Sequence, residues 1–422
     1  MAGWSPAITP HVPPAPLSDD SRTAALRALI SLERGVMPHL SEWDAAEVGL
    51  EGSDAGLARE LILGCATHAR LYDWLSDRFL RPGPQPAELR IALRIAAHQL
   101  LAFDRVPPHA AVATAVEALR RIGCPHLTGV ANAVARRIGE LRLEQREGDG
   151  PLGRLPFDQR PESEAVRHGL PDLLIQDLGD GLPEPRDAQL AALNRRPHLC
   201  TRTRPGAPSV HGSSILRREG AWIWWGDPHE ALRGPVADNR CVVQDRSQGR
   251  VADAILQTAK ARPGDLVLDL CAAPGGKSTG MRDAGLVVIS ADVSSSKVTE
   301  MPGDLLRVVS DGLAPAFTPG FEVVLVDAPC SNTGVLGRRP EARLRYDRKH
   351  RDQLIDLQSE LLSAAAALVV PGGRLVYSTC SICPPENEGV AHNLDGWRVL
   401  GQHLQWPNEW EAGGYYAVLL KV

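Results

Sequence analysis

The sequence has no run of eighteen apolar residues, and its first residues lack the basic stretch and apolar core of a secretory signal. The first absence argues against a membrane span, and the second argues against export. Cysteine is also sparse, with eight in 422 residues, which is thin for a disulfide framework and favours reduced thiols. We therefore expect a cytoplasmic protein without a membrane partner, and we expect it to be a monomer.

An excess of positive charge is missing as well, since 46 Lys and Arg stand against 51 Asp and Glu, for a net charge of -5. This balance argues against a uniformly basic nucleic-acid-binding protein, although phosphates respond to local patches rather than to the total charge. Pairs of arginines recur along the chain, and for each pair alone a solvated helix face is the favoured explanation. The densest basic cluster directly follows Cys330, and for it a functional role and a solvated surface both stay open. It comprises Arg338, Arg339, Arg343, Arg345, Arg348, Lys349 and Arg351.

A chain of 422 residues predicts two or three domains. Residues 1–20 are rich in proline and indicate a flexible tail. Residues 21–143 carry apolar residues at helical spacing without a strand signal, which predicts an all-α domain. Residues 144–190 are interpreted as a linker and residues 191–250 as a small α+β segment. In that segment Trp222, Trp224 and Trp225 either fill a core or stack on bases, and core packing is favoured.

Residues 251–422 alternate continuous apolar strands with helices, which predicts an α/β domain with a doubly wound, mostly parallel sheet covered on both faces. The expected strands end at Asp269, Asp292, Asp311 and Asp327. Ligands of such sheets bind beyond the carboxyl ends of the strands, so these acids are expected beside a ligand. Any one of them also suits a helix N-cap, but four in successive strands are better explained by a ligand.

A glycine-bearing turn, Cys271-Ala272-Ala273-Pro274-Gly275-Gly276-Lys277, follows the first of these strands. A phosphate loop would need glycine where Cys271 stands, and Pro274 removes a backbone N–H that would bind phosphate. The neighbouring acids suit a cation instead, and S-adenosylmethionine carries a sulfonium and an amino group but no phosphate. Asp292 would then accept bonds from both ribose hydroxyls, and Asp311 would lie near the adenine.

Cys330 and Cys380 follow two strands that should be neighbours, so both thiols are expected to face one cleft. The structural alternative is a pair of buried small hydrophobic residues. Cys383 forms Cys-x-x-Cys with Cys380, but no second ligand pair has zinc spacing, so no metal is expected. A thiolate that adds to carbon 6 of a pyrimidine makes carbon 5 nucleophilic toward a methyl donor. Two thiols beside such a donor therefore predict pyrimidine C5 methylation.

Several segments closely resemble the Sun/Fmu family of RNA cytosine-C5 methyltransferases. They are Asp269–Thr279, Asp327–Gly334, Arg338–Glu341 and Tyr377–Glu388, and Gln244–Gln248 resembles that family's entry segment. The stretches Ala58–Gly64, Ala97–Leu101, His109–Val112 and Asn132–Arg136 resemble a NusB-like RNA-binding domain. Together they give the layout of bacterial enzymes that methylate small-subunit ribosomal RNA. The resemblance thus implies an RNA partner and S-adenosylmethionine as cofactor.

The resemblance also implies site roles, with Cys380 as the nucleophile and Cys330 assisting product release. Asp327 is assigned to catalysis and, with residues 271–277, Asp292 and Asp311, to holding the cofactor and the target base. A Cys330 nucleophile is the rival assignment, because DNA enzymes of related chemistry use the cysteine of the Pro-Cys segment.

Three segments depart from the family pattern. The interval from Asp292 to Asp311 is short for the family, which predicts a truncated helix. The family's Arg-x-Asn is replaced by Thr201-Arg202-Thr203. The C-terminal signature lacks its usual acid and reads Gly413-Gly414-Tyr415-Tyr416. Two other functions stay in view: a non-enzymatic NusB-like assembly factor with a degenerate methyltransferase domain, and a phosphate-loop NTPase.

Overall fold

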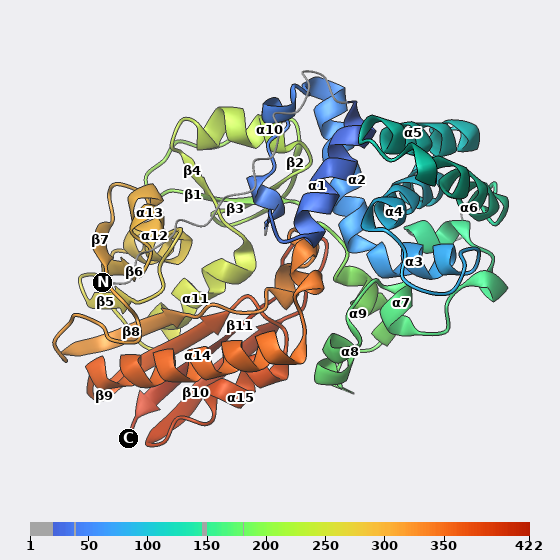
Figure 1. The fold of residues 1–422 in the computed structure, drawn as a ribbon. Helices are drawn as coiled ribbons and strands as arrows, with labels where there is room; N and C mark the ends of the chain where they lie inside the picture. The colour runs from blue at the N-terminus through green and yellow to red at the C-terminus, as the bar shows by residue number, and fades with distance from the viewer. Residues whose placement is uncertain (1–19, 38, 146–149, 180) are drawn as a thin grey trace, which may run out of the picture. The chain divides into compact units, whose positions relative to one another are not determined.

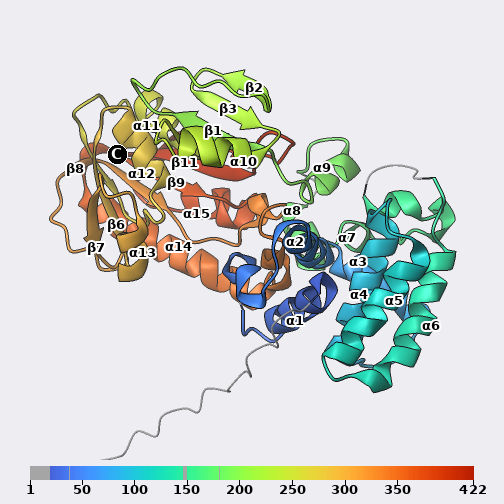
Figure 2. The ribbon, with the colours of Figure 1, turned by 90° about the horizontal axis from the view of Figure 1, so that it is seen from above.

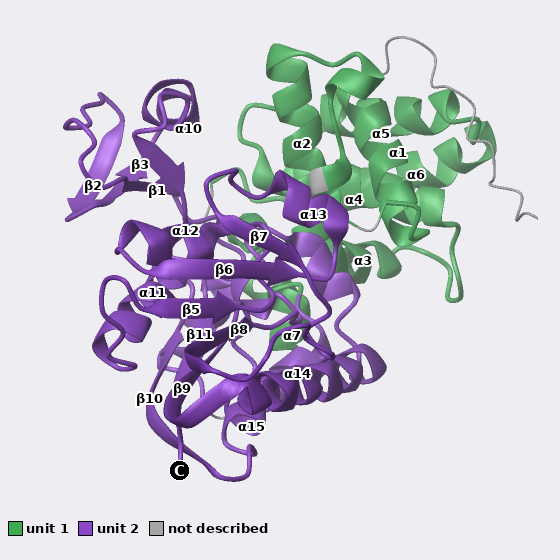
Figure 3. Cartoon of the chain, turned by 90° about the vertical axis from the view of Figure 1, so that its left-hand side faces the viewer, with its two compact units in different colours: residues 1–169 green, residues 170–422 purple. Residues whose placement is uncertain are grey.

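A computed structural model describes residues 20–37, 39–145, 150–179 and 181–422, and the chain forms two compact units, residues 1–169 and 170–422 (Figure 3). The expected tail, residues 1–20, lies outside the described residues except for Asp20. The segment expected as a linker is divided between the units. It contains the short helices α7 (Glu164–Arg167), α8 (Asp172–Leu178) and α9 (Arg186–Ala192).

The first unit is helical in its described part, as the periodicity predicts (Figure 1). Its longer helices are α1 (Ser21–Glu33), α2 (Gly52–Thr67), α3 (Ala69–Asp77), α4 (Ala87–Ala102), α5 (Pro108–Arg121) and α6 (Thr128–Glu140). They share one apolar core in which Leu61, Ile91 and Ile95 are almost fully buried. Asp20 caps α1 by accepting bonds from two backbone N–H groups. The prediction of an all-α domain is confirmed.

In the second unit, helices α8 and α9 are followed by a small antiparallel sheet in the order β2-β3-β1-β4. Its strands are β1 (Leu199–Thr203), β2 (Ile215–Glu219), β3 (Trp222–Trp225) and β4 (Cys241–Val243), and α10 (Pro228–Ala231) precedes β4. Trp222, Trp224 and Trp225 are all buried. The indole N–H of Trp225 donates to Thr201 Oγ1 at 2.9 Å, and that of Trp224 donates to the Trp410 carbonyl at 2.6 Å. Core packing, the favoured interpretation of this cluster, is therefore correct.

The large sheet has seven strands in the order β10-β11-β9-β8-β5-β6-β7. Five of them run parallel: β5 (Leu266–Asp269), β6 (Val287–Asp292), β7 (Leu306–Val309), β8 (Phe321–Asp327) and β9 (Val369–Thr379). Strand β11 (Gly414–Lys421) lies antiparallel between β9 and β10 (Trp397–Gln405). The doubly wound, mostly parallel sheet is confirmed, and this antiparallel edge is an addition to the prediction.

Helices cover both faces of the large sheet (Figure 2). Helices α11 (Arg246–Gln257) and α12 (Gly276–Asp283) bury Ile255 and Met281 against one face. Helices α14 (Arg348–Leu368) and α15 (Glu388–Ala391) bury Leu361, Leu362 and Val390 against the other. Helix α13 (Ser295–Glu300) has six residues, in agreement with the truncation expected there. Within the described ranges, no helix has the length and apolar character needed to cross a membrane.

The order of the strands reverses between β5 and β8, because β6 and β7 continue to one side of β5 while β8 and β9 continue to the other. The carboxyl ends of β5 and β8 therefore mark the switch point of the sheet, which is the usual ligand position in this class of fold. The glycine turn and both cysteine segments follow strands at this edge.

Candidate active site

The glycine turn joins β5 to α12 and rests on a buried carboxyl group. Gly275 has a φ of 95°, and a Cβ there would approach Leu305 Cδ1 and Pro302 Cδ at 3.1 Å, so glycine is required. Asp269 is fully buried below the turn and accepts a bond from Ser278 Oγ at 2.7 Å. Burial raises the pKa of Asp269 to about 7. Asp269 therefore stabilises the turn through its bond to Ser278, at a fully buried position. This differs from the expectation that all four strand-end acids lie beside a ligand.

Two further acids follow the next two strands, β6 and β7. Asp292 ends β6 and accepts bonds from the N–H groups of Ala273 at 3.2 Å and Ser294 at 3.0 Å. Asp311 lies two residues beyond the end of β7, not at its end as predicted, because the strand stops at Val309. Its carboxylate accepts the N–H of Leu313 at 2.9 Å.

The four carboxylates converge on Cys271 in the turn. Burial raises the pKa of this thiol well above its ordinary value, and the negative charges of Asp269, Asp327, Asp292 and Asp311 raise it further. Negative charge gathered around the turn repels phosphate and attracts a cation. These carboxylates therefore fit the sulfonium and amino groups of S-adenosylmethionine.

Lys277 is the cation of the turn, and it is already engaged. Its side chain is 8% exposed, and its Nζ donates to Asp327 Oδ2 at 2.6 Å and to Gln248 Oε1. Gln244, from the same entry segment as Gln248, donates to the Gly276 carbonyl at 2.9 Å. These bonds tie the lysine to the end of β8. It is thus poorly placed to clamp phosphates, which argues against the NTPase alternative.

The structure brings the two predicted site cysteines together. Cys380 directly follows β9, and Cys330 lies three residues beyond β8. These strands are parallel neighbours with Asp327 opposite Ser378, and Ser378 Oγ donates to Asp327 Oδ1 at 2.8 Å. The Cys330 and Cys380 sulfur atoms are 3.1 Å apart, and both cysteines are free thiols. Both lie within reach of one ligand, as expected from the strand order.

The two thiols differ in acidity. The hydrogen bond from Cys330 lowers the pKa of Cys380 despite its burial, and the positive charges of Lys277 and Arg339 act in the same direction. The same hydrogen bond, together with burial, raises the pKa of Cys330 well above its ordinary value. The hydrogen bond between the two sulfur atoms therefore makes Cys380 the more acidic thiol of the pair.

Asn332 is a site residue that the sequence did not single out. It has a φ of 61°, and its side-chain Nδ2 donates to the Cys330 carbonyl at 3.0 Å. Its Oδ1 lies 3.2 Å from Cys380 Sγ. The only sequence signal for it was its position inside the Asp327–Gly334 segment that carries the family resemblance.

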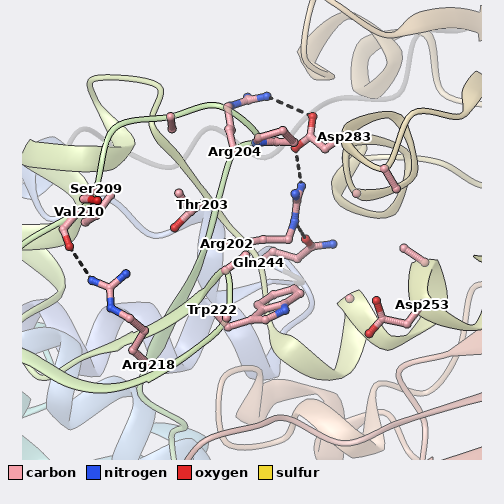
Figure 4. A pocket seen from close by; sticks show the side chains of 18 of the residues that line it. Arg202, Thr203, Arg204, Ser209, Val210, Arg218, Trp222, Gln244, Asp253 and Asp283 are labelled. Atoms are coloured by element: carbon pink, nitrogen blue, oxygen red, sulfur yellow. Dashed lines mark hydrogen bonds and ion pairs between the residues drawn. The ribbon is translucent and has the colours of Figure 1, made fainter. Parts of the chain in front are cut away.

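A separate cavity of about 480 Å³ lies between the small sheet and helices α11 and α12 (Figure 4). Arg202 crosses it, donating to Gln244 Oε1 at 2.8 Å and to Asp283 Oδ2 at 2.8 Å. Neither Cys330 nor Cys380 lines this cavity. Arg202, from the segment that departs from the family pattern, thus joins the small sheet to the helix that follows the glycine turn.

Two family models match the chain. Residues 256–398 match the model of 16S rRNA methyltransferase RsmB/F, and residues 19–140 match that of the NusB family. A putative methyltransferase of Mycobacterium tuberculosis is 32% identical over 89% of this chain and 90% of its own length. The ribosomal RNA small subunit methyltransferase B of Erwinia tasmaniensis is 31% identical over 81% of this chain and 82% of its own.

Solved structures support the fold. The crystal structure of the protein PH0851 has a TM-score of 0.70 at 22% identity and covers 96% of this chain and 99% of its own. A methyltransferase homolog protein from Pyrococcus horikoshii has a TM-score of 0.51 at 20% identity, over 61% of this chain and 98% of its own. At these identities the likeness concerns the fold alone.

Proposed function

The chain belongs to the RsmB/F family of rRNA methyltransferases, and from that premise we propose that it methylates carbon 5 of a cytosine in small-subunit ribosomal RNA. It is an RNA methyltransferase whose cofactor is S-adenosylmethionine. The single observation that carries the C5 assignment is the pair of adjacent thiols, with Cys330 Sγ 3.1 Å from Cys380 Sγ. A thiolate is what activates carbon 5 of a pyrimidine, by adding to carbon 6.

The cofactor, when bound, supplies an electrophilic methyl group. Residues 271–277 of the glycine turn would hold it from below, and Asp292 would accept bonds from the ribose hydroxyls. Asp311 would lie on the adenine side, and Asp327 would face both the cofactor and the target base. This assignment is supported by the negative charge that surrounds the turn.

Cys380 starts the reaction by attacking carbon 6, which requires the base to leave its stack. After methyl transfer, carbon 5 must lose its proton before the bond to Cys380 can break. The largest cause that raises the pKa of Cys330 is its hydrogen bond to Cys380. Once Cys380 is bonded to the base, its sulfur no longer accepts that bond, and Cys330 loses its proton to solvent more readily. The Cys330 thiolate can then accept the proton of carbon 5, the C5–C6 double bond re-forms, and Cys380 leaves as a thiolate.

We further propose that residues 21–143 bind the RNA, with residues 144–190 as the connection, residues 191–250 as an entry segment and residues 251–422 as the methyltransferase domain. The enzyme would act as a monomer in the cytoplasm, where reducing conditions keep both catalytic thiols free.

The test is a methyl-transfer assay on naked small-subunit RNA and on assembling subunits with labelled S-adenosylmethionine, followed by mapping of 5-methylcytosine. We expect one or a few modified cytosines. Binding of the cofactor without methyl transfer to either substrate would favour the assembly-factor alternative. Methylation at an exocyclic nitrogen would overturn the C5 assignment.

A further inference from the structure

We propose that Glu386 is a positioning residue that ties the two cysteine loops together and thereby sets the distance between the Cys330 and Cys380 thiols. This inference rests on the proposed function, since it concerns the same thiol pair. Glu386 belongs to the Pro-Pro-Glu-Asn-Glu stretch that follows Cys383. Neither the cofactor assignment nor the cysteine roles make use of it.

The carboxylate of Glu386 bonds the residue directly after each cysteine. Glu386 is fully buried. One oxygen accepts the N–H of Ser331 at 2.9 Å, and the other accepts Ser381 Oγ at 2.7 Å as well as Ser331 Oγ. The neighbours of Cys330 and Cys380 are therefore held by one rigid group. A change in the position of that group moves both sulfur atoms.

Gln358 and Tyr377 bond Glu386 itself, and Asn387 fixes the residue that follows it. Gln358 on α14 donates to Glu386 Oε1 at 3.0 Å and to the Pro329 carbonyl at 2.9 Å. Tyr377 on β9 donates its hydroxyl to the Glu386 carbonyl at 2.6 Å. Asn387, the next residue, bonds Thr379 Oγ1 at 2.7 Å and the Ser381 carbonyl at 3.1 Å. The carboxylate is thus anchored to the sheet and to α14, with neutral donors on each oxygen.

The charge of Glu386 also distinguishes the two thiols. After the bond to Cys380 and burial, the negative charge of Glu386 contributes to the raised pKa of Cys330. The leading influences on the pKa of Cys380 do not include Glu386. Its charge therefore makes Cys330 less acidic relative to Cys380.

The test measures the alkylation of each cysteine by iodoacetamide in the full-length protein without RNA, resolved by peptide mass spectrometry between about pH 5 and about pH 9. In this reaction the thiolate displaces iodide from the reagent, so the rate follows the thiolate population. The wild type should react first at Cys380.

Glu386→Ala removes the carboxylate that bonds Ser331 and Ser381. The alkylation rate of Cys380 at neutral pH should fall roughly tenfold, and the pH midpoint of that rate should shift upward. Glu386→Gln keeps the shape but not the charge, and the preference for Cys380 over Cys330 should fall roughly tenfold.

A matched control is Glu411→Gln, which removes the charge of another buried glutamate that pairs with Arg250 at 2.9 Å. It should leave the alkylation pattern unchanged. Cofactor affinity by calorimetry should be unchanged in all three variants, which separates positioning from loss of structure.

Two results would overturn the inference in distinguishable ways. If the wild type is alkylated first at Cys330, the proposed nucleophile is wrong, and the inference falls with it. If the wild type reacts first at Cys380 and both Glu386 variants keep that preference and that pH midpoint, the proposed function stands. The backbone bond from Gly334 N–H to the Cys380 carbonyl at 2.9 Å is then enough to join the loops.

Discussion

The glycine turn after β5 and the cysteine loops after β8 and β9 share one sheet edge but are built differently. The turn is held around charged groups, by the bond from Ser278 to Asp269 and by the ion pair of Lys277 with Asp327. The cysteine loops are held around one buried carboxylate, that of Glu386, which accepts bonds from Ser331 and Ser381. Charge dominates the turn, with four carboxylates around Cys271, whereas neutral hydroxyl and amide groups dominate around Glu386.

This difference indicates a division of labour. Charge attracts a cationic cofactor without demanding one exact position, because electrostatic attraction falls off slowly with distance. Bond formation between a thiolate and carbon 6 requires the reacting atoms to be closely aligned. Substitutions in the turn should therefore weaken binding by degrees, and substitutions in the cysteine loops should stop the chemistry.

The largest effect is expected for Cys380→Ser, which should abolish turnover and form no covalent RNA adduct. A hydroxyl is a far weaker nucleophile than a thiolate at neutral pH. A denaturing gel with labelled RNA and cofactor measures both outcomes. Cys124→Ser, at a half-buried cysteine of the helical unit, is the control and should behave like the wild type. A persistent adduct with the Cys380 variant would give the nucleophilic role to Cys330.

The next effect separates the two thiols. Cys330→Ala should permit attack and methyl transfer but slow the loss of the carbon 5 proton, so an RNA–protein adduct resistant to denaturant should accumulate. General acid–base assistance typically contributes roughly a hundredfold or more to rate. The same gel measures the adduct. If the Cys330 variant forms none while turning over normally, Cys330 has no part in product release.

Most of the turn could be predicted from the sequence, and most of the linkage between the loops could not. The strands ending at Asp269, Asp292 and Asp327 are continuous apolar runs, which burial on both faces requires. The end of β7 was misplaced because Leu306 and Val309 are exposed on this edge strand. An edge strand has a neighbour on one side only, so its apolar pattern gives a weak boundary.

Helix starts and long-range contacts leave different traces in the sequence. Helices α11 and α14 begin at Arg246 and Arg348 because Asp245 and Asp347 cap them by accepting backbone N–H bonds, a local signal that the sequence does contain. The roles of Asn332 and Glu386 depend on contacts with residues about fifty positions away. No local pattern records such a contact, so only the family resemblance drew attention to their segments.

A smaller effect is expected in the turn. Asp292→Ala should weaken S-adenosylmethionine binding roughly tenfold or more, because losing a hydrogen bond to a charged group costs about 1.5–3 kcal/mol. Calorimetry on the free protein measures it. Asp304→Ala removes an exposed acid that pairs with Arg282 and should leave the affinity unchanged. Equal affinities for the Asp292 variant and the wild type would place the ribose contact elsewhere.

The ionisation of Asp269, the buried acid of the turn, should make the stability of the protein depend on pH. The folded pKa of Asp269 is raised to about 7. The stability that the protonated group contributes is therefore full below its ordinary pKa and is lost as pH rises through the folded pKa. Asn cannot ionise. The melting temperature of Asp269→Asn relative to wild type should therefore rise by roughly 2 °C or more between about pH 4 and about pH 8. A difference that stays constant with pH would mean that Asp269 ionises as easily in the folded as in the unfolded chain.

The smallest effect concerns the helical unit and tests whether exposed arginines on α6 contribute to RNA binding. Arg136 and Arg137 are exposed on α6. Replacing both with Gln should weaken RNA binding a few-fold and reduce the slope of log affinity against log salt by about 1 for each lost phosphate contact. Cofactor affinity should not change. The control is Arg90→Gln, whose guanidinium pairs with Asp77 at 2.9 Å and is 23% exposed. Salt slopes identical to the wild type in the double variant would remove this face of α6 from the RNA-binding surface and leave the specificity of the enzyme to the catalytic unit.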